Sequence, residues 1–324
     1  MTYRAPVEDY NFLFEHVVGL DRLRVTERFG DATADVTRAI LTEAGKFCEE
    51  VMAPLQRAGD THPAYLENGI VRTSPGFREG YKAICEGGWV GMSADPEYGG
   101  MGLPMAVTAA VGDMMSGSCL SLQLAPMLTQ GQIEALEHHA SDRLKELYLP
   151  KLISGEWTGT MNLTEPQAGS DVGALTTKAV DNGDGTYAIT GQKIYITWGD
   201  HDLGGNVCHL VLARIEDAPA GVKGISLFLV PKFLVNPDGS LGERNDVKTV
   251  GVEHKLGIHS SPTCTLQFGD NGGAVGYLVG EGKLSINRAC GCVGLSRSAY
   301  YRKPMDQTKR DAPVVDVLNQ IVAR

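Results

Sequence analysis

The most informative stretch of this 324-residue sequence reads Thr158-Gly159-Thr160-Met161-Asn162-Leu163-Thr164-Glu165-Pro166-Gln167-Ala168-Gly169-Ser170-Asp171. It gathers hydroxyl groups, small residues and a proline into one turn-forming segment. Such a loop can direct backbone N–H groups and the Ser170 hydroxyl at an anionic diphosphate, while Gly169 permits close approach of the backbone. By composition alone, the segment is also compatible with a strand end and a tight turn that bind nothing.

The sequence before this stretch has the periodicity of helices. From Asp31 to Met52, apolar residues recur at spacings of three and four, as in a helix that buries one face. Gly-rich breaks such as Tyr98–Gly102 separate further helical patterns. These patterns cover residues 77–85, 105–115, 130–139 and 143–152. We therefore predict that residues 1–155 form an N-terminal all-helical domain.

The sequence after the stretch has the character of β-structure. Short segments rich in Ile, Val, Thr and Tyr alternate with turn signals such as Asn182-Gly183-Asp184-Gly185. These segments cover residues 187–190, 193–197, 208–213, 224–230 and 263–268. No helical pattern separates them, which favours an antiparallel β-barrel or sandwich over a parallel nucleotide-binding sheet. The predicted fold class is α+β, with a middle β-domain at residues 156–283.

Charge and cysteine content restrict the partners. The chain has 39 acidic and 29 basic residues, and its net charge of −10 argues against nucleic acid or a membrane as the main partner. Its seven cysteines form neither a disulfide framework nor a C-x-x-C metal clamp. The N-terminus lacks the layout of a signal peptide. We predict a cytoplasmic protein that binds no metal.

Several segments resemble one enzyme family, the acyl-CoA dehydrogenases. Leu163–Asp171 is similar to the flavin-binding signature of that family, and further similar segments follow at family-like spacing. These are Gly191-Gln192-Lys193-Ile194-Tyr195-Ile196-Thr197, Val211-Leu212-Ala213-Arg214 and Lys255-Leu256-Gly257-Ile258-His259-Ser260-Ser261-Pro262-Thr263. The resemblance covers roughly residues 3–282 and implies two of the family's three domains, so the C-terminal helical domain is expected to be missing. Tyr3–Pro6, Gly159–Met161 and Gly199–Leu203 most resemble the 3-methylmercaptopropionyl-CoA dehydrogenase subgroup.

The resemblance implies that the chain binds FAD. Carried over by position, Leu163 and Thr164 contact the flavin ring, and Ser170 contacts the diphosphate beside Gly169. The same comparison places Tyr195 and Thr197 on the other face of the ring. Many relatives have tryptophan at the position of Tyr195, although tyrosine still offers an aromatic face and a polar tip. Without the signature, Tyr195 and Thr197 would be interpreted as ordinary sheet packing.

The resemblance also implies α,β-dehydrogenation of an acyl-CoA thioester, with electron-transfer flavoprotein or a similar acceptor as partner. In the family, a carboxylate removes the α-proton while the β-hydrogen passes to the flavin. The missing C-terminal domain normally supplies that base and much of the homo-oligomer interface. We assign no catalytic residue: Glu165 is expected to hold the turn, and Glu253, His254 and His259 have no partner recognisable from sequence. Little or no activity is expected, and the homo-oligomer is expected to be lost.

The composition changes again near Lys283. Residues 284–324 contain seven basic and three acidic side chains and fit a helix, a turn at Gly294 and a second helix capped by Ser296. Residues 285–324 resemble a fragment of an insertion-sequence transposase, so we expect a foreign, helix-turn-helix-like tail. Two alternatives to an enzyme stay open: a non-catalytic flavin-binding remnant, and a DNA-binding fusion through this tail. The acidic body of the chain disfavours DNA.

Overall fold

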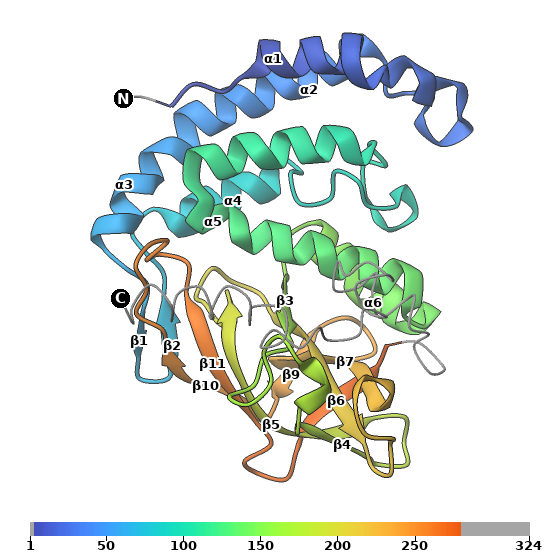
Figure 1. The fold of residues 1–324 in the computed structure, drawn as a ribbon, viewed down its shortest axis with the longest axis vertical. Coiled ribbons are helices and arrows are strands. Elements are labelled where there is room, and N and C mark those ends of the chain that lie inside the picture. Colours follow the sequence, from blue (N-terminus) through green and yellow to red (C-terminus); the bar gives the residue numbers. More distant parts are fainter. Residues whose placement is uncertain (1–2, 280–324) are drawn as a thin grey trace, which may run out of the picture. The chain divides into compact units, whose positions relative to one another are not determined.

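The computed structural model describes residues 3–279, in which the helices come first and most of the strands follow (Figure 1). The expectations for the tail at residues 284–324 lie outside the described residues. The α-helices are α1 (Val7–Phe12), α2 (Ala34–Phe47), α3 (Ala53–Thr61), α4 (Phe77–Glu86), α5 (Met105–His139) and α6 (Asp142–Ile153). The short 3-10 and π-helical turns between them are η1 (Leu13–Val18), η2 (Leu20–Val25), η3 (Glu27–Phe29), η4 (Cys48–Met52) and η5 (Pro96–Tyr98).

The first long helical pattern forms the helix that the sequence predicts. Thr33 caps α2, since its side chain accepts a hydrogen bond from Val36 N at 3.2 Å. The helix continues through η4 into α3, and Leu41, Cys48 and Met52 are fully buried on one face. The apolar periodicity of the sequence therefore predicts the buried face of this helix correctly.

Helix α5 is the central helix of the N-terminal part. The two helices predicted at residues 105–115 and 130–139 belong to this one element, which bends at Cys119, a residue with non-helical φ of −155° and ψ of 83°. By length and composition α5 could cross a membrane, but 56% of its most apolar window is buried by the rest of the fold, as in the core helix of many globular proteins. Thr129 Oγ1 accepts a hydrogen bond from Gly159 N at 3.0 Å and so attaches α5 to the first strand of the β-domain.

The strands of the second part form one large sheet and a small hairpin. They are β3 (Thr158–Asn162), β4 (Lys178–Asp181), β5 (Tyr187–Thr197), β6 (Val207–Ile215), β7 (Ile225–Pro231), β8 (Phe233–Val235), β9 (Leu241–Arg244), β10 (Val247–Val252), β11 (Thr263–Phe268) and β12 (Ala274–Leu278). The pairings β4–β5, β5–β12, β12–β7, β7–β6 and β6–β4 close a ring. Ile189, Val211 and Phe228 are fully buried in its core.

This ring confirms the predicted β-rich middle domain, with one difference in strand direction. Among the described strands, β3 and β4 each run parallel to β6, and the other pairings are antiparallel. Parallel neighbours need a long connection, and here the chain between β3 and β6 passes through the signature segment, β4 and β5. The sequence shows only that no helix intervenes, so it could not reveal these two pairings.

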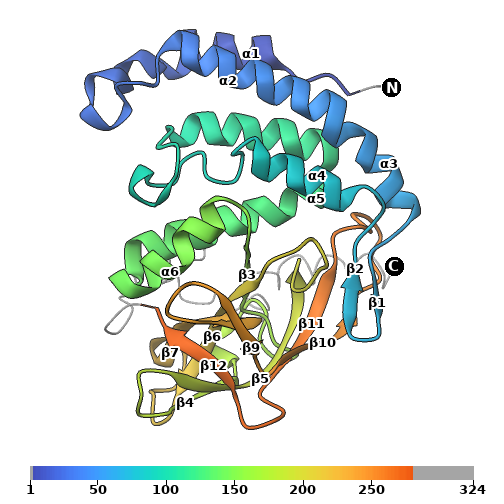
Figure 2. The same cartoon turned by 180° about the vertical axis from the view of Figure 1, so that it is seen from behind.

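The N-terminal part differs from the all-helical expectation at one place. Strands β1 (Tyr65–Glu67) and β2 (Ile70–Arg72) form a hairpin whose turn residues, Asn68 and Gly69, have φ of 50° and 75°. An Asn-Gly pair with positive φ at both positions is the preferred two-residue hairpin turn. The hairpin lies beside β10 and β11 (Figure 2), and Val71 is fully buried in the core of the β-domain. It therefore joins the helices to the β-domain.

Candidate functional site

The signature segment leaves β3 as a tight loop. Glu165 N donates to Ala168 O at 2.9 Å, and Ala168 N donates to Glu165 O at 3.0 Å, so the backbone turns back on itself within four residues. Asp171 then accepts a hydrogen bond from Gly173 N at 2.9 Å and starts a single 3-10 turn. The loop is therefore ordered by hydrogen bonds among its own residues.

The Glu165 carboxylate anchors this loop from the inside. Its Oε1 accepts hydrogen bonds from Thr177 N at 3.0 Å and Thr177 Oγ1 at 2.5 Å. Its Oε2 accepts from Thr176 N at 2.7 Å, Thr176 Oγ1 at 2.9 Å and Gln167 Nε2 at 2.6 Å. Buried carboxylates need such partners, because the desolvation of an unpaired charge is costly. The expectation that Glu165 holds the turn is confirmed.

Lys193 joins the loop to strand β5. Its Nζ lies 2.8 Å from Glu165 Oε1 and 3.1 Å from the Leu163 carbonyl oxygen. Burial alone raises the pKa of Glu165, but the hydrogen bonds from Lys193 and Thr177 outweigh it and lower the pKa to about 2. Glu165 is therefore an ionised structural group, and a carboxylate saturated with donors cannot act as a general base at neutral pH.

Strand β5 carries a bulge next to this ion pair. Leu266 pairs with Lys193 and Cys264 pairs with Ile196, so Thr265 alone faces two residues, Ile194 and Tyr195. The bulge places Lys193 and Ile196 inside although they are three residues apart, and both are at least 98% buried. Between them, Tyr195 adopts a left-handed φ of 58° and is 61% exposed.

The structure brings four of the six predicted cofactor residues to one place. Ile194 N donates to Thr164 O at 2.9 Å, so Leu163 and Thr164 lie against the strand that carries Tyr195 and Thr197. Thr197 pairs with Thr263 two residues beyond Tyr195. The other two, Gly169 and Ser170, lie at the exposed end of the loop, where no hydrogen bond joins them to β5 in the described region.

Gly169 provides a test of whether the loop suits a bound group. A Cβ placed on Gly169 would meet no atom of the described chain within 4 Å, and its φ is outside the left-handed range. No contact with residues 3–279 therefore requires glycine at this position. The open space beside Gly169, the neighbouring Ser170 hydroxyl and the exposed Tyr195 ring fit a large ligand that carries both an anionic and a flat aromatic part.

A second polar network lies against β3, and its role is not apparent from the sequence. Leu203 N donates to His201 Nδ1 at 3.2 Å, so the His201 proton is on Nε2, which donates to Thr158 Oγ1 at 2.7 Å. His209 Nδ1 lies 2.7 Å from Thr160 Oγ1. Burial lowers the pKa of His201 to about 4 and that of His209 to about 3. Both rings are neutral and structural at physiological pH.

Comparisons with known proteins agree with this architecture. Residues 34–156 match the model of the acyl-CoA dehydrogenase N-terminal domain, and residues 160–271 match that of the middle domain. A 3-methylmercaptopropionyl-CoA dehydrogenase from Ruegeria pomeroyi is 48% identical over 87% of this chain and 47% of its own length. A butyryl-CoA dehydrogenase from Syntrophomonas wolfei is 39% identical over 87% of this chain and 47% of its own length.

Solved structures show the same relationship. Butyryl-CoA dehydrogenase from Megasphaera elsdenii superposes with a TM-score of 0.63 at 25% identity, over 80% of this chain and 62% of that one. The chain spans about half the length of the curated relatives it matches. The chain therefore belongs to the acyl-CoA dehydrogenase family, whose N-terminal helical domain and β-rich middle domain it contains.

Proposed function

We propose that the chain binds FAD on the face formed by the signature loop and strand β5. Leu163, Thr164, Tyr195 and Thr197 contact the flavin ring, and Gly169 and Ser170 contact the diphosphate. The observation that carries this proposal is the ion pair between Lys193 and Glu165, which fastens the loop to β5. Thr164 is thereby held against the strand that carries the exposed ring of Tyr195. Membership of the acyl-CoA dehydrogenase family supports it independently.

The reaction proposed is the α,β-dehydrogenation of an acyl-CoA thioester. FAD, when bound, accepts the hydrogen that leaves the β-carbon of the substrate. The chain's own residues would orient the flavin. Tyr195 offers an exposed aromatic face to the flavin ring, and the loop is fixed next to it. We assign no catalytic base among residues 3–279. Glu165, the carboxylate of the loop, is buried and accepts hydrogen bonds from Thr177 and Lys193.

The proposed substrate is a short-chain acyl-CoA such as 3-methylmercaptopropionyl-CoA, since the relative of that name is 48% identical. Electron-transfer flavoprotein or a similar carrier is the proposed electron acceptor, and the cytoplasm is the proposed location.

We further propose that the chain divides into three domains, at residues 1–155, 156–283 and 284–324. The DNA-binding alternative depends on the last of these segments and stays a prediction, because residues 280–324 are outside the described region.

The experiment is an anaerobic absorbance spectrum of the purified full chain reconstituted with excess FAD, recorded before and after 3-methylmercaptopropionyl-CoA is added. We expect a flavin band that stays with the protein through gel filtration. Bleaching of the band by the thioester supports the dehydrogenase reaction, whereas a retained band without bleaching favours the non-catalytic flavin-binding alternative. Folded protein that retains no flavin contradicts the proposal.

A further inference from the structure

Two residues with left-handed backbone lie at the end of strand β5, on either side of a predicted flavin contact. Tyr195 has a φ of 58° and Trp198 a φ of 53°, and Thr197 lies between them in the sequence. Trp198 belongs to a tight turn, since Gly199 N donates to Ile196 O at 3.1 Å. It occupies the third position of this turn, where a positive φ favours glycine or asparagine over a large aromatic residue. The backbone alone therefore does not explain a tryptophan at this position.

The indole ring of Trp198 connects the turn to helix α5. Its Nε1 donates to the Ser121 carbonyl oxygen at 3.0 Å, and Trp198 is fully buried. Ser121 lies two residues after Cys119, where α5 bends. The ring of Phe77, the first residue of α4, stacks on Trp198 with ring centroids 6.4 Å apart. The side chain of Trp198 therefore fastens the end of β5 to two helices of the N-terminal part.

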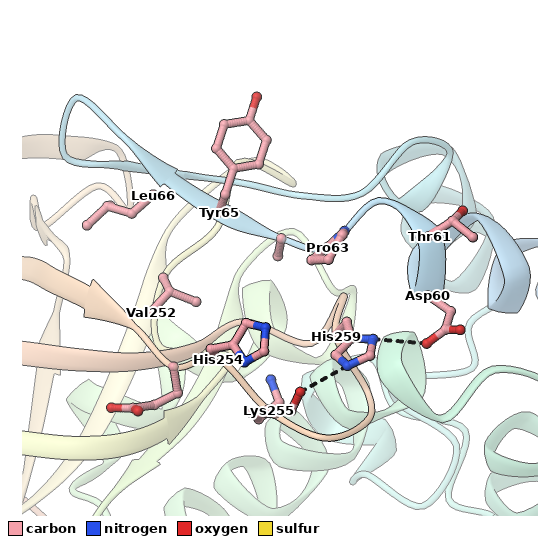
Figure 3. A pocket seen from close by; sticks show the side chains of 11 residues that line it. Asp60, Thr61, Pro63, Tyr65, Leu66, Val252, His254, Lys255 and His259 are labelled. Carbon is pink, nitrogen blue, oxygen red and sulfur yellow. Dashed lines mark hydrogen bonds and ion pairs between the residues drawn. The ribbon is translucent and has the colours of Figure 1, made fainter.

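The backbone of Trp198 is held by the segment that follows β10. Trp198 N donates to the Pro262 carbonyl oxygen at 2.7 Å. The residues that precede Pro262 border an open groove of about 370 Å³, where Figure 3 shows His259 directed toward Asp60 of α3. His259 Nδ1 lies 3.0 Å from Asp60 Oδ1. The segment that accepts the Trp198 N–H is therefore itself attached to the helical part.

We propose that Trp198 is a positioning residue of the flavin site, because its indole N–H anchors the end of β5 to α5 and so fixes Tyr195 and Thr197 for contact with the flavin ring. The inference rests on the proposed binding of FAD. Trp198 is fully buried, so it acts through its neighbours on β5. A site that is rigid before its ligand arrives binds more tightly, since less conformational entropy is lost on binding. Without the anchor, Tyr195 and Thr197 would have to be ordered when FAD binds.

The test compares two buried tryptophans that differ in hydrogen bonding. Trp198→Phe removes the indole N–H together with part of the ring. Trp157→Phe removes the same atoms from another buried ring, but Trp157 Nε1 has no hydrogen-bond partner among residues 3–279. Both variants lose a similar volume from the core, so a difference between them reports the anchor.

FAD affinity is measured on the purified full chain by quenching of flavin fluorescence, and the visible circular dichroism of the bound flavin reports the surroundings of its ring. We expect Trp198→Phe to bind FAD about threefold to tenfold more weakly than Trp157→Phe, the size expected for the loss of one hydrogen bond, and to show weaker flavin dichroism. In the flavin-free chain, hydrogen exchange of a peptide covering residues 193–199 should become faster in Trp198→Phe but not in Trp157→Phe.

The outcomes separate this inference from the proposed function. Wild-type protein that binds no FAD contradicts the proposed function before any variant is compared, and the inference falls with it. If the wild type binds FAD and both variants bind it equally well, Trp198 only fills the core, and the inference alone is overturned.

A non-natural residue keeps the test valid if Trp198→Phe does not fold. The residue is 3-benzothienylalanine, incorporated at position 198, which keeps the shape of the indole ring and replaces only its N–H by sulfur. We expect the same loss of FAD affinity relative to the wild type. Unchanged affinity would overturn the inference.

Discussion

Lys193 Nζ and Glu165 Oε1 lie 2.8 Å apart, and neither side chain exposes more than 2% of its surface. The pair connects two segments separated by 28 residues, because Glu165 belongs to the signature loop and Lys193 to β5. The same ammonium group also binds the Leu163 carbonyl oxygen. The geometry of the proposed flavin site therefore depends on one buried cation that does not itself reach the exposed face.

Replacing Lys193 by methionine should destabilise the protein strongly. The methionine side chain would fill much of the space but leave the Glu165 carboxylate buried without its counterion, a change that costs about 3–5 kcal/mol in comparable sites. Urea unfolding followed by circular dichroism measures the loss. Lys178→Met is the matched control, since Lys178 is exposed on β4 and should change stability by less than about 0.5 kcal/mol. Equal effects of the two variants would show that the buried pair contributes nothing.

The Glu165 carboxylate should also make stability depend on pH below neutrality. Its pKa is lowered from 4.5 to about 2 in the folded protein, so the folded state favours the ionised form. The resulting stabilisation, about 3 kcal/mol at most, is present above pH 4.5 and is lost as pH falls toward 2. Glu165→Gln should therefore be less stable than the wild type at pH 7, with a difference that narrows between pH 4.5 and 2. A difference that stays constant over this window would contradict the assignment.

Much of the fold can be predicted because its signals are local. The helix at Asp31–Met52 follows from apolar periodicity, and strand β11 is predicted with its observed ends because β-branched residues and turn signals bound it. The role of Glu165 is also expected, since it lies inside a recognisable turn. The β1–β2 hairpin escapes prediction although its Asn68-Gly69 signal is present, because the surrounding sequence has a helical pattern.

The other contacts that escape prediction are long-range. The ion-pair partner of Glu165 lies 28 residues further along the chain on strand β5, and the partner of His259 lies 199 residues away on α3. A bulge also interrupts the alternation of inward and outward side chains along β5. A regular strand would therefore direct either Lys193 or Ile196 outward. These features depend on how strands and helices meet in space, which composition and spacing do not specify. The predicted cofactor residues, by comparison, lie in two short segments that a motif can mark.

A substitution at Gly169 can separate an effect on protein stability from an effect on FAD binding. An alanine meets no atom of the described chain, so Gly169→Ala should keep the stability of the wild type or raise it by up to about 1 kcal/mol. If FAD lies where Gly169 is open, the added methyl group should weaken its binding by tenfold or more, measured by quenching of flavin fluorescence. Gly251→Ala is the control, because Gly251 on β10 also has open space around it but is outside the loop. Unchanged FAD affinity in Gly169→Ala would remove this residue from the site.

Tyr195 combines an unfavourable backbone conformation with an exposed ring. This combination is expected of a side chain that contacts a ligand. Left-handed backbone costs a non-glycine residue about 1–3 kcal/mol, and asparagine tolerates it better than tyrosine. Tyr195→Asn should therefore leave the melting temperature unchanged or raise it, while FAD affinity falls because the aromatic face is lost. Tyr195→Trp should retain FAD. If both variants bind FAD equally well, the ring does not contact the flavin, and the strain at Tyr195 needs another explanation.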